Sequence, residues 1–86
     1  MLEVASESMT RGGNVATLEY SLPAAGEVLV AVYDVTGRRV TTLVNEYQTA
    51  GARQTVWNHA GVAQGMYFVR LWTRSASMTR SMLILE

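Results

Sequence analysis

One stretch of the sequence decides the fold: Val28-Leu-Val-Ala-Val-Tyr-Asp-Val-Thr-Gly-Arg-Arg-Val-Thr-Thr-Leu-Val44. Valine occupies every second position over residues 28–32, and this period of two in β-branched residues predicts a β-strand. Asp34 supplies turn chemistry, because its carboxylate can accept a hydrogen bond from the backbone N–H two residues on. Gly37 can adopt the left-handed conformation that closes a three-residue hairpin with a bulge. Residues 40–44 are then expected to return as the partner strand of a β-hairpin.

The same alternation predicts strands on both sides of this hairpin. Six strands are expected, at residues 15–22, 28–33, 40–44, 53–57, 66–72 and 78–85. Residues 1–14 are a candidate for a first strand or a linker, with a turn at residues 10–14. Short connections that contain glycine, together with the lack of any helical period, predict an all-β fold. We expect an immunoglobulin-like antiparallel β-sandwich of about seven strands, without the Cys…Trp…Cys spacing of antibody domains.

Alternation also predicts which side chains form the core. Nine are expected to be buried between two sheets: Leu18, Tyr20, Val28, Val30, Val32, Val40, Trp57, Val69 and Leu71. Tyr67, Met82 and Ile84 are expected to face inward as well. Trp57 should close one end of the core because a buried indole covers a large apolar area. Gly51 is expected to need a positive φ.

Composition limits the classes of partner. The 86 residues are 49% apolar, and the net charge is zero. We therefore expect one domain over residues 1–86, and neither nucleic acid nor an anionic membrane as a partner. The chain has no cysteine, which excludes disulfides and thiolate metal sites. No apolar run approaches the roughly 20 residues that a membrane span requires. The N-terminal residues lack a signal peptide, so the chain is expected to be either cytosolic or a fragment of a longer exported protein.

The sequence contains few residues in patterns that suit catalysis. His59 is the only histidine, and a single imidazole in a glycine-rich loop is expected to be solvated. Asp34 is explained by the turn. The six glutamates are scattered, and none pairs at a spacing that suits acid and base roles. We expect no catalytic residue, no metal site, no cofactor and no small-molecule substrate.

Two groups of side chains are candidates for binding. Trp72, Tyr47 and Phe68 could stack on sugar rings, as in carbohydrate-binding sandwich modules, although single exposed apolar residues are common. Arg38 and Arg39 lie at the predicted hairpin tip, where arginines are often merely solvated. Arg80 is expected on the outer face of the last strand.

An ordered set of motifs resembles the C-terminal sorting domain of the type IX secretion system. The set covers residues 15–85 and includes Tyr-Ser-Leu-Pro at 20–23, Ala-Gly at 50–51, and six motif residues: Tyr33, Asp34, Gly37, Trp57, Gly65 and Tyr67. The pattern is also similar to the immunoglobulin-like domain of flagellar hook-capping proteins.

The resemblance implies a non-catalytic signal that targets a cargo protein to the type IX translocon. The implied partners are outer-membrane translocon or sorting components and an N-terminal cargo domain in the same chain. The implied location is the outer surface of a Gram-negative bacterium, or the medium, after transit through the periplasm. Candidate recognition residues are Arg38, Arg39, Arg80, Met82 and Ile84. A carbohydrate-binding module and a structural or adhesive sandwich, each attached to a secreted enzyme, stay open as alternatives.

Overall fold

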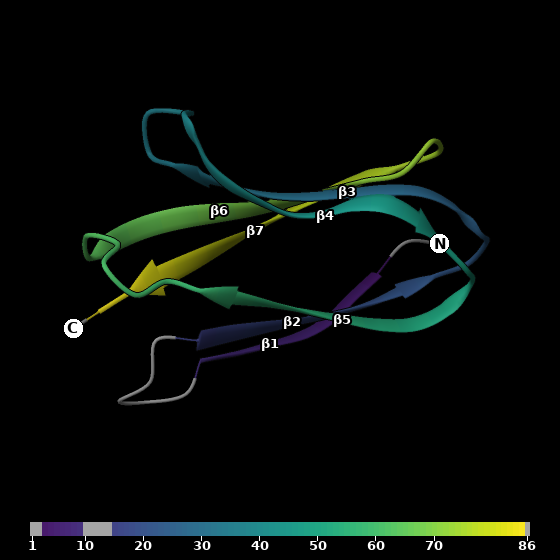
Figure 1. Cartoon of the computed structure of the whole chain (residues 1–86), viewed down its shortest axis with the longest axis horizontal. Coiled ribbons are helices and arrows are strands. Elements are labelled where there is room, and N and C mark those ends of the chain that lie inside the picture. Colours follow the sequence, from purple (N-terminus) through teal and green to yellow (C-terminus); the bar gives the residue numbers. More distant parts are fainter. Residues whose placement is uncertain (1–2, 10–14, 86) are drawn as a thin grey trace.

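The computed structural model describes residues 3–9 and 15–85 (Figure 1). These residues form seven β-strands: β1 (Glu3–Met9), β2 (Val15–Leu22), β3 (Gly26–Asp34), β4 (Arg39–Gln48), β5 (Gly51–Asn58), β6 (Gly65–Trp72) and β7 (Ser77–Ile84). The turn expected at residues 10–14 lies outside the described residues. Within the described part of the chain, no helix is long and apolar enough to cross a membrane.

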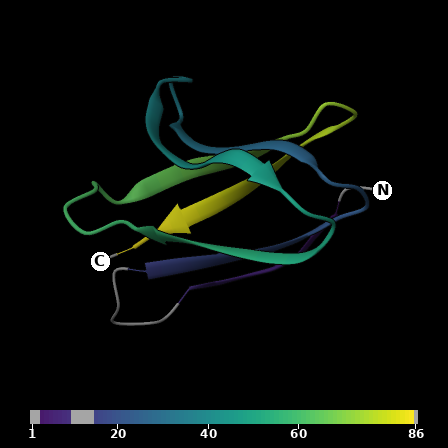
Figure 2. The same cartoon turned by 45° about the vertical axis from the view of Figure 1, so that its right-hand side comes forward.

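The strands form two antiparallel sheets that face each other. One sheet has three strands in the order β1-β2-β5, and the other has four in the order β4-β3-β6-β7. Figures 1 and 2 show the two sheets as layers, with the chain passing between them from β2 to β3, from β4 to β5 and from β5 to β6. The predicted all-β, immunoglobulin-like antiparallel sandwich is confirmed.

The core lies between the sheets and follows the predicted alternation. Thirteen apolar side chains form one buried cluster: Ala16, Leu18, Tyr20, Leu22, Val28, Val30, Val32, Trp57, Tyr67, Val69, Leu71, Met82 and Ile84. Trp57 is 4% exposed, and its ring meets that of Tyr67 edge-on at 5.5 Å between centroids. Because Trp57 belongs to the three-stranded sheet and Tyr67 to the four-stranded one, this contact joins the two layers.

Val40 is the one predicted core residue that the structure places outside, with 38% of its surface exposed. Val32 pairs with Thr41 while Tyr33 pairs with Arg39, so Val40 is an extra residue on β4. Such a bulge shifts the alternation of side chains by one position. The prediction that Val40 is buried was wrong, because it assumed that side chains alternate without interruption where the strand has this bulge.

His59 is also placed differently from its expected position. It is 7% exposed, and its imidazole lies against the Trp57 ring at 5.4 Å between centroids. The loop after β5 folds back on itself, since the Val62 N–H donates to the His59 carbonyl at 3.1 Å. The expectation of a solvated imidazole was wrong, and His59 instead covers the end of the core beside Trp57.

Candidate recognition surface

The tip of the β3–β4 hairpin is built around Asp34. Its Oδ1 accepts hydrogen bonds from the Thr36 hydroxyl at 2.6 Å, the Thr36 N–H at 2.9 Å and the Arg38 N–H at 3.1 Å. These bonds favour the carboxylate, and the Thr36 hydroxyl contributes most to lowering the pKa of Asp34. Gly37 has a φ of +85°, as the predicted turn requires, and Gly51 has the expected positive φ at +120°.

The two arginines at this tip have different surroundings. Arg38 is exposed, and its backbone closes the turn, because its carbonyl accepts from the Asp34 N–H at 3.0 Å. The Arg39 guanidinium lies 5.7 Å from the centre of the Tyr33 ring. Its Nε and Nη2 donate to the Tyr33 hydroxyl at 3.3 and 3.1 Å. Arg38 therefore presents a solvated charge, while Arg39 is held flat against the sheet.

The last strand, β7, forms one edge of the four-stranded sheet and pairs with β6. Met82 and Ile84 are 5% and 2% exposed, so their side chains hold β7 against the core. A partner that contacts this strand would meet its backbone and its exposed side chains. An edge strand offers backbone N–H and C=O groups to which another strand can add.

Arg80 lies in the middle of β7 on the face opposite to the expected one. It pairs with the buried Val69, and it therefore shares a face with Met82 rather than lying on the outer face of the sheet. Its side chain is nevertheless exposed, because it lies at the edge of the sandwich. An inward-pointing charge on an edge strand hinders indiscriminate strand pairing.

The sequence-predicted residues thus lie in two places. Arg38 and Arg39 are at the hairpin tip, and Arg80, Met82 and Ile84 are on the inner face of β7. A shallow groove on the outer face runs from the hairpin tip to β7 and is lined by Tyr33, Asp34, Val35, Gly37, Phe68, Arg70 and Thr79. Thr79 and Arg80 point to opposite faces of β7, so the groove does not join the tip to Arg80.

The structure brings together five side chains on the outer face of the four-stranded sheet, which we call the cation–aromatic cluster: Tyr33, Arg39, Phe68, Arg70 and Trp72. Sequence reasoning named Arg39, Phe68 and Trp72 as separate binding candidates, but it missed Arg70 and the grouping. The Arg70 guanidinium lies 5.2 Å from the centre of the Trp72 ring. Trp72 in turn meets Tyr33 edge-on at 6.1 Å, and Phe68 pairs with Tyr33 across the strands. The period of two in β6 could have indicated that Phe68, Arg70 and Trp72 share the outer face, because these residues alternate with the core residues.

A family model for secretion-system C-terminal sorting domains matches residues 13–85, which include six of the seven strands. The chain belongs to this family. Its members carry a C-terminal sorting signal for type IX secretion, and membership implies export to the cell surface or the medium. The search of curated proteins gave no match. The predicted resemblance is confirmed. Of the six motif residues, Trp57 and Tyr67 lie in the core, Asp34 and Gly37 shape the hairpin turn, Gly65 begins β6, and Tyr33 lies on the outer face of β3.

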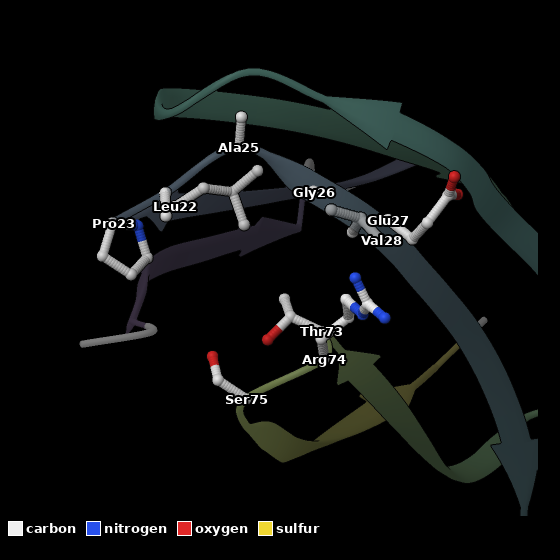
Figure 3. A pocket seen from close by; sticks show the side chains of 10 residues that line it. Leu22, Pro23, Ala25, Gly26, Glu27, Val28, Thr73, Arg74 and Ser75 are labelled. Atoms are coloured by element: carbon white, nitrogen blue, oxygen red, sulfur yellow. The ribbon is translucent and has the colours of Figure 1, made fainter.

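The sorting domain also has a small cleft at one end of the sandwich (Figure 3). The segment from Leu22 to Val28 forms one wall, and Thr73, Arg74 and Ser75 of the β6–β7 turn form the other. This turn is fixed by its own bonds, since the Thr73 N–H donates to the Ala76 carbonyl at 2.8 Å. The lining is mainly apolar, with Glu27 and Arg74 as its charged members. The cleft does not gather acid, base and nucleophile in the way that a catalytic site requires.

Proposed function

We propose that this sorting domain is a non-catalytic signal that directs an N-terminal cargo domain of the same chain to the type IX translocon. The cargo would reach the outer membrane of a Gram-negative bacterium through the periplasm and would then be attached to the cell surface. The observation that carries the proposal is the family match over residues 13–85, which includes every strand of the four-stranded sheet.

Recognition in this proposal uses the folded surface together with the edge of β7. The buried side chains of Met82 and Ile84 fix the strand, so that its outer backbone groups are held ready for a partner strand. Arg80 would select a partner that offers a carboxylate, because an unpaired arginine beside an added strand is costly. Arg38 at the hairpin tip offers a second exposed charge.

The test is a fusion of residues 1–86 to the C-terminus of a fluorescent reporter that is exported to the periplasm of a host with a working type IX system. We expect the reporter at the cell surface or in the medium. Deletion of residues 78–86 should leave the reporter in the periplasm. This deletion also removes two core residues, so it cannot by itself separate lost recognition from lost folding.

Charge reversals at exposed positions separate those two causes. Arg38→Glu and Arg80→Glu should change the free energy of unfolding by about 0.5 kcal/mol or less, as is usual at exposed sites. Loss of export with an unchanged thermal melting curve would locate a recognition surface. An intact fusion that stays in the periplasm, folded by circular dichroism, would overturn the proposal in favour of a structural or adhesive module.

The carbohydrate-binding alternative has weaker support in the geometry. Stacking on a sugar requires a free ring face, but guanidinium groups lie over Tyr33 and Trp72. Tyr47 is 62% exposed, and Phe68 is half-buried. These rings do not form a continuous platform of free faces.

A further inference from the structure

We propose that the cation–aromatic cluster on the outer face of the four-stranded sheet binds an acidic, extended segment of a partner protein. This inference rests on the proposed function, since the partner would be part of the export machinery, and it adds a second contact surface to the edge of β7. The side chains of the cluster come from β3, β4 and β6, which are neighbours in the sheet.

The cluster carries two exposed positive charges. Arg39 and Arg70 both face outward, because they pair with Tyr33 and Ala31 on the outer face of β3. Their contacts within the described chain are Tyr33 for Arg39, and Trp72 and Thr79 for Arg70; none of these is a carboxylate.

The acidic residues near this face do not neutralise it. Glu27 lies beside Trp72 at one end of the cluster, in a pocket that Arg74 also lines, so a further arginine accompanies this carboxylate. The Asp34 carboxylate stays ionised and lines the outer groove with Arg70, but its Oδ1 is already occupied by three hydrogen bonds from the turn. Three arginines (Arg39, Arg70 and Arg74) thus lie in or beside the cluster with two carboxylates, so the face is positively charged although the whole chain has a net charge of zero. Such a surface complements an acidic partner.

The geometry of the two guanidinium groups suits a carboxylate ligand. A guanidinium that lies over an aromatic ring keeps the N–H donors at its edge, and these donors match the two oxygens of a carboxylate. Ala31 is fully buried although it faces outward, so the longer side chains around it lie down over the sheet. The guanidinium groups are thus held in place before a ligand arrives, which lowers the entropic cost of binding.

The surroundings of the cluster favour a peptide over a sugar. The rings of Tyr33 and Trp72 already have guanidinium groups over them, which disfavours a sugar ring as the stacking partner. The same outer face continues into exposed apolar side chains, with Met66 at 39% and Leu83 at 46% exposure on paired strands. A polypeptide offers carboxylates together with apolar side chains, and an extended segment matches the two-residue period of a sheet surface. The observations therefore favour an acidic peptide over an acidic glycan.

The binding test uses the isotopically labelled domain and the NMR signals of the arginine Nε–H groups. The probe is a short peptide of alternating glutamate and threonine, and the matched control peptide has glutamine in place of glutamate. We expect the glutamate peptide to shift the Arg39 and Arg70 signals, with weaker binding at high salt. The double variant Arg39→Gln, Arg70→Gln should raise the dissociation constant about tenfold or more. Arg53→Gln, on the other sheet, is the control and should bind like the wild type.

Two outcomes of this titration would overturn the inference. An oligogalacturonate that shifts these signals when the glutamate peptide does not would identify an acidic glycan as the ligand. Equal losses in the Arg53→Gln control and the double variant would show only general charge attraction.

The reporter fusion separates this inference from the proposed function. We expect the Arg39→Gln, Arg70→Gln fusion to reach the cell surface about tenfold less than the wild-type fusion, with an unchanged melting curve. If the wild-type fusion is exported and the double variant is exported equally well, the inference fails and the proposed function stands. If the wild-type fusion is not exported, the proposed function fails, and the peptide titration still reports on the surface.

Discussion

The outer faces of the two sheets differ, although their inner faces build one core. On the three-stranded sheet, β2 presents Thr17, Glu19 and Ser21 outward, between buried residues. On the four-stranded sheet, the outer side of β3 carries Leu29, Ala31 and Tyr33. A sandwich needs only one apolar face on each sheet. The second apolar face of β3 is therefore more than the fold requires, and it suggests contact with another molecule.

The contrast extends to charge. On the outer face of the four-stranded sheet, Arg39 and Arg70 are placed over aromatic rings. On the three-stranded sheet, the outer face of β2 carries Glu19. Arg53 of β5 pairs with the buried Tyr20 and so lies on the inner side of that sheet, where its Nη2 donates to the Thr49 carbonyl at 3.0 Å. The four-stranded sheet thus exposes arginines on its outer face, whereas Arg53 of the three-stranded sheet stabilises a turn.

The largest effect is expected for Trp57→Ala, which removes the main contribution of β5 to the shared core. Large-to-small changes of this kind cost about 3–5 kcal/mol, because the surrounding side chains fill the cavity only in part. The loss should appear as a lower free energy of unfolding in urea, and both sheets should unfold in one transition. A cost below about 1 kcal/mol would show that the contacts of Trp57 with Tyr67 and His59 contribute little to the core.

A matched pair of substitutions compares the outer faces directly. Phe68→Ala on the four-stranded sheet should cost about 1–2 kcal/mol, because a half-buried ring loses part of its apolar contact. Val56→Ala on the three-stranded sheet, where the side chain is 49% exposed, should cost about 0.5 kcal/mol or less. Urea unfolding of both variants measures the difference. Equal costs would mean that the cation–aromatic cluster adds no packing beyond that of an ordinary sheet surface.

The parts of the fold that depend on residues close together in sequence could be predicted. The alternation of valines predicted the inner face of β3, and Asp34 and Gly37 predicted the turn. The bulge at Val40 could not be predicted in this way, since it arises from the pairing of β4 with β3. The burial of His59 depends on a loop that folds over Trp57.

The candidate site was harder to predict than the fold. The cation–aromatic cluster depends on register, because Arg39 lies beside Tyr33, and Arg70 beside Ala31, only when three strands are aligned. Charge and aromatic content in the sequence do not show which side chains meet. Arg80 is exposed although it lies on an inner face. This too could not be predicted from local sequence, because it depends on where the opposite sheet ends.

The smallest expected effect concerns the hydrogen bond that links the sheets. The Tyr20 hydroxyl, on β2, donates to Oε1 of Gln48, on β4, at 2.6 Å. Tyr20→Phe should lower the free energy of unfolding by about 1 kcal/mol at neutral pH, the usual net value of one hydrogen bond. Urea unfolding at neutral pH measures this cost, and an unchanged midpoint would show that the bond does not stabilise the sandwich.

The same substitution should change the response to alkaline pH. Burial raises the pKa of Tyr20 and outweighs the opposing effects of the Gln48 bond and the Arg53 charge. The unfolded chain then releases the phenol proton near pH 10, its ordinary value, while the folded chain still holds it. The contribution of Tyr20 to stability is therefore complete below about pH 10 and is lost as the pH rises through the folded pKa. The Tyr20→Phe variant has no phenol proton to release. The difference in the free energy of unfolding between wild type and variant should therefore become smaller above about pH 10. A gap in urea midpoints that stays constant on both sides of that pH would show that burial of the phenol does not oppose its ionisation.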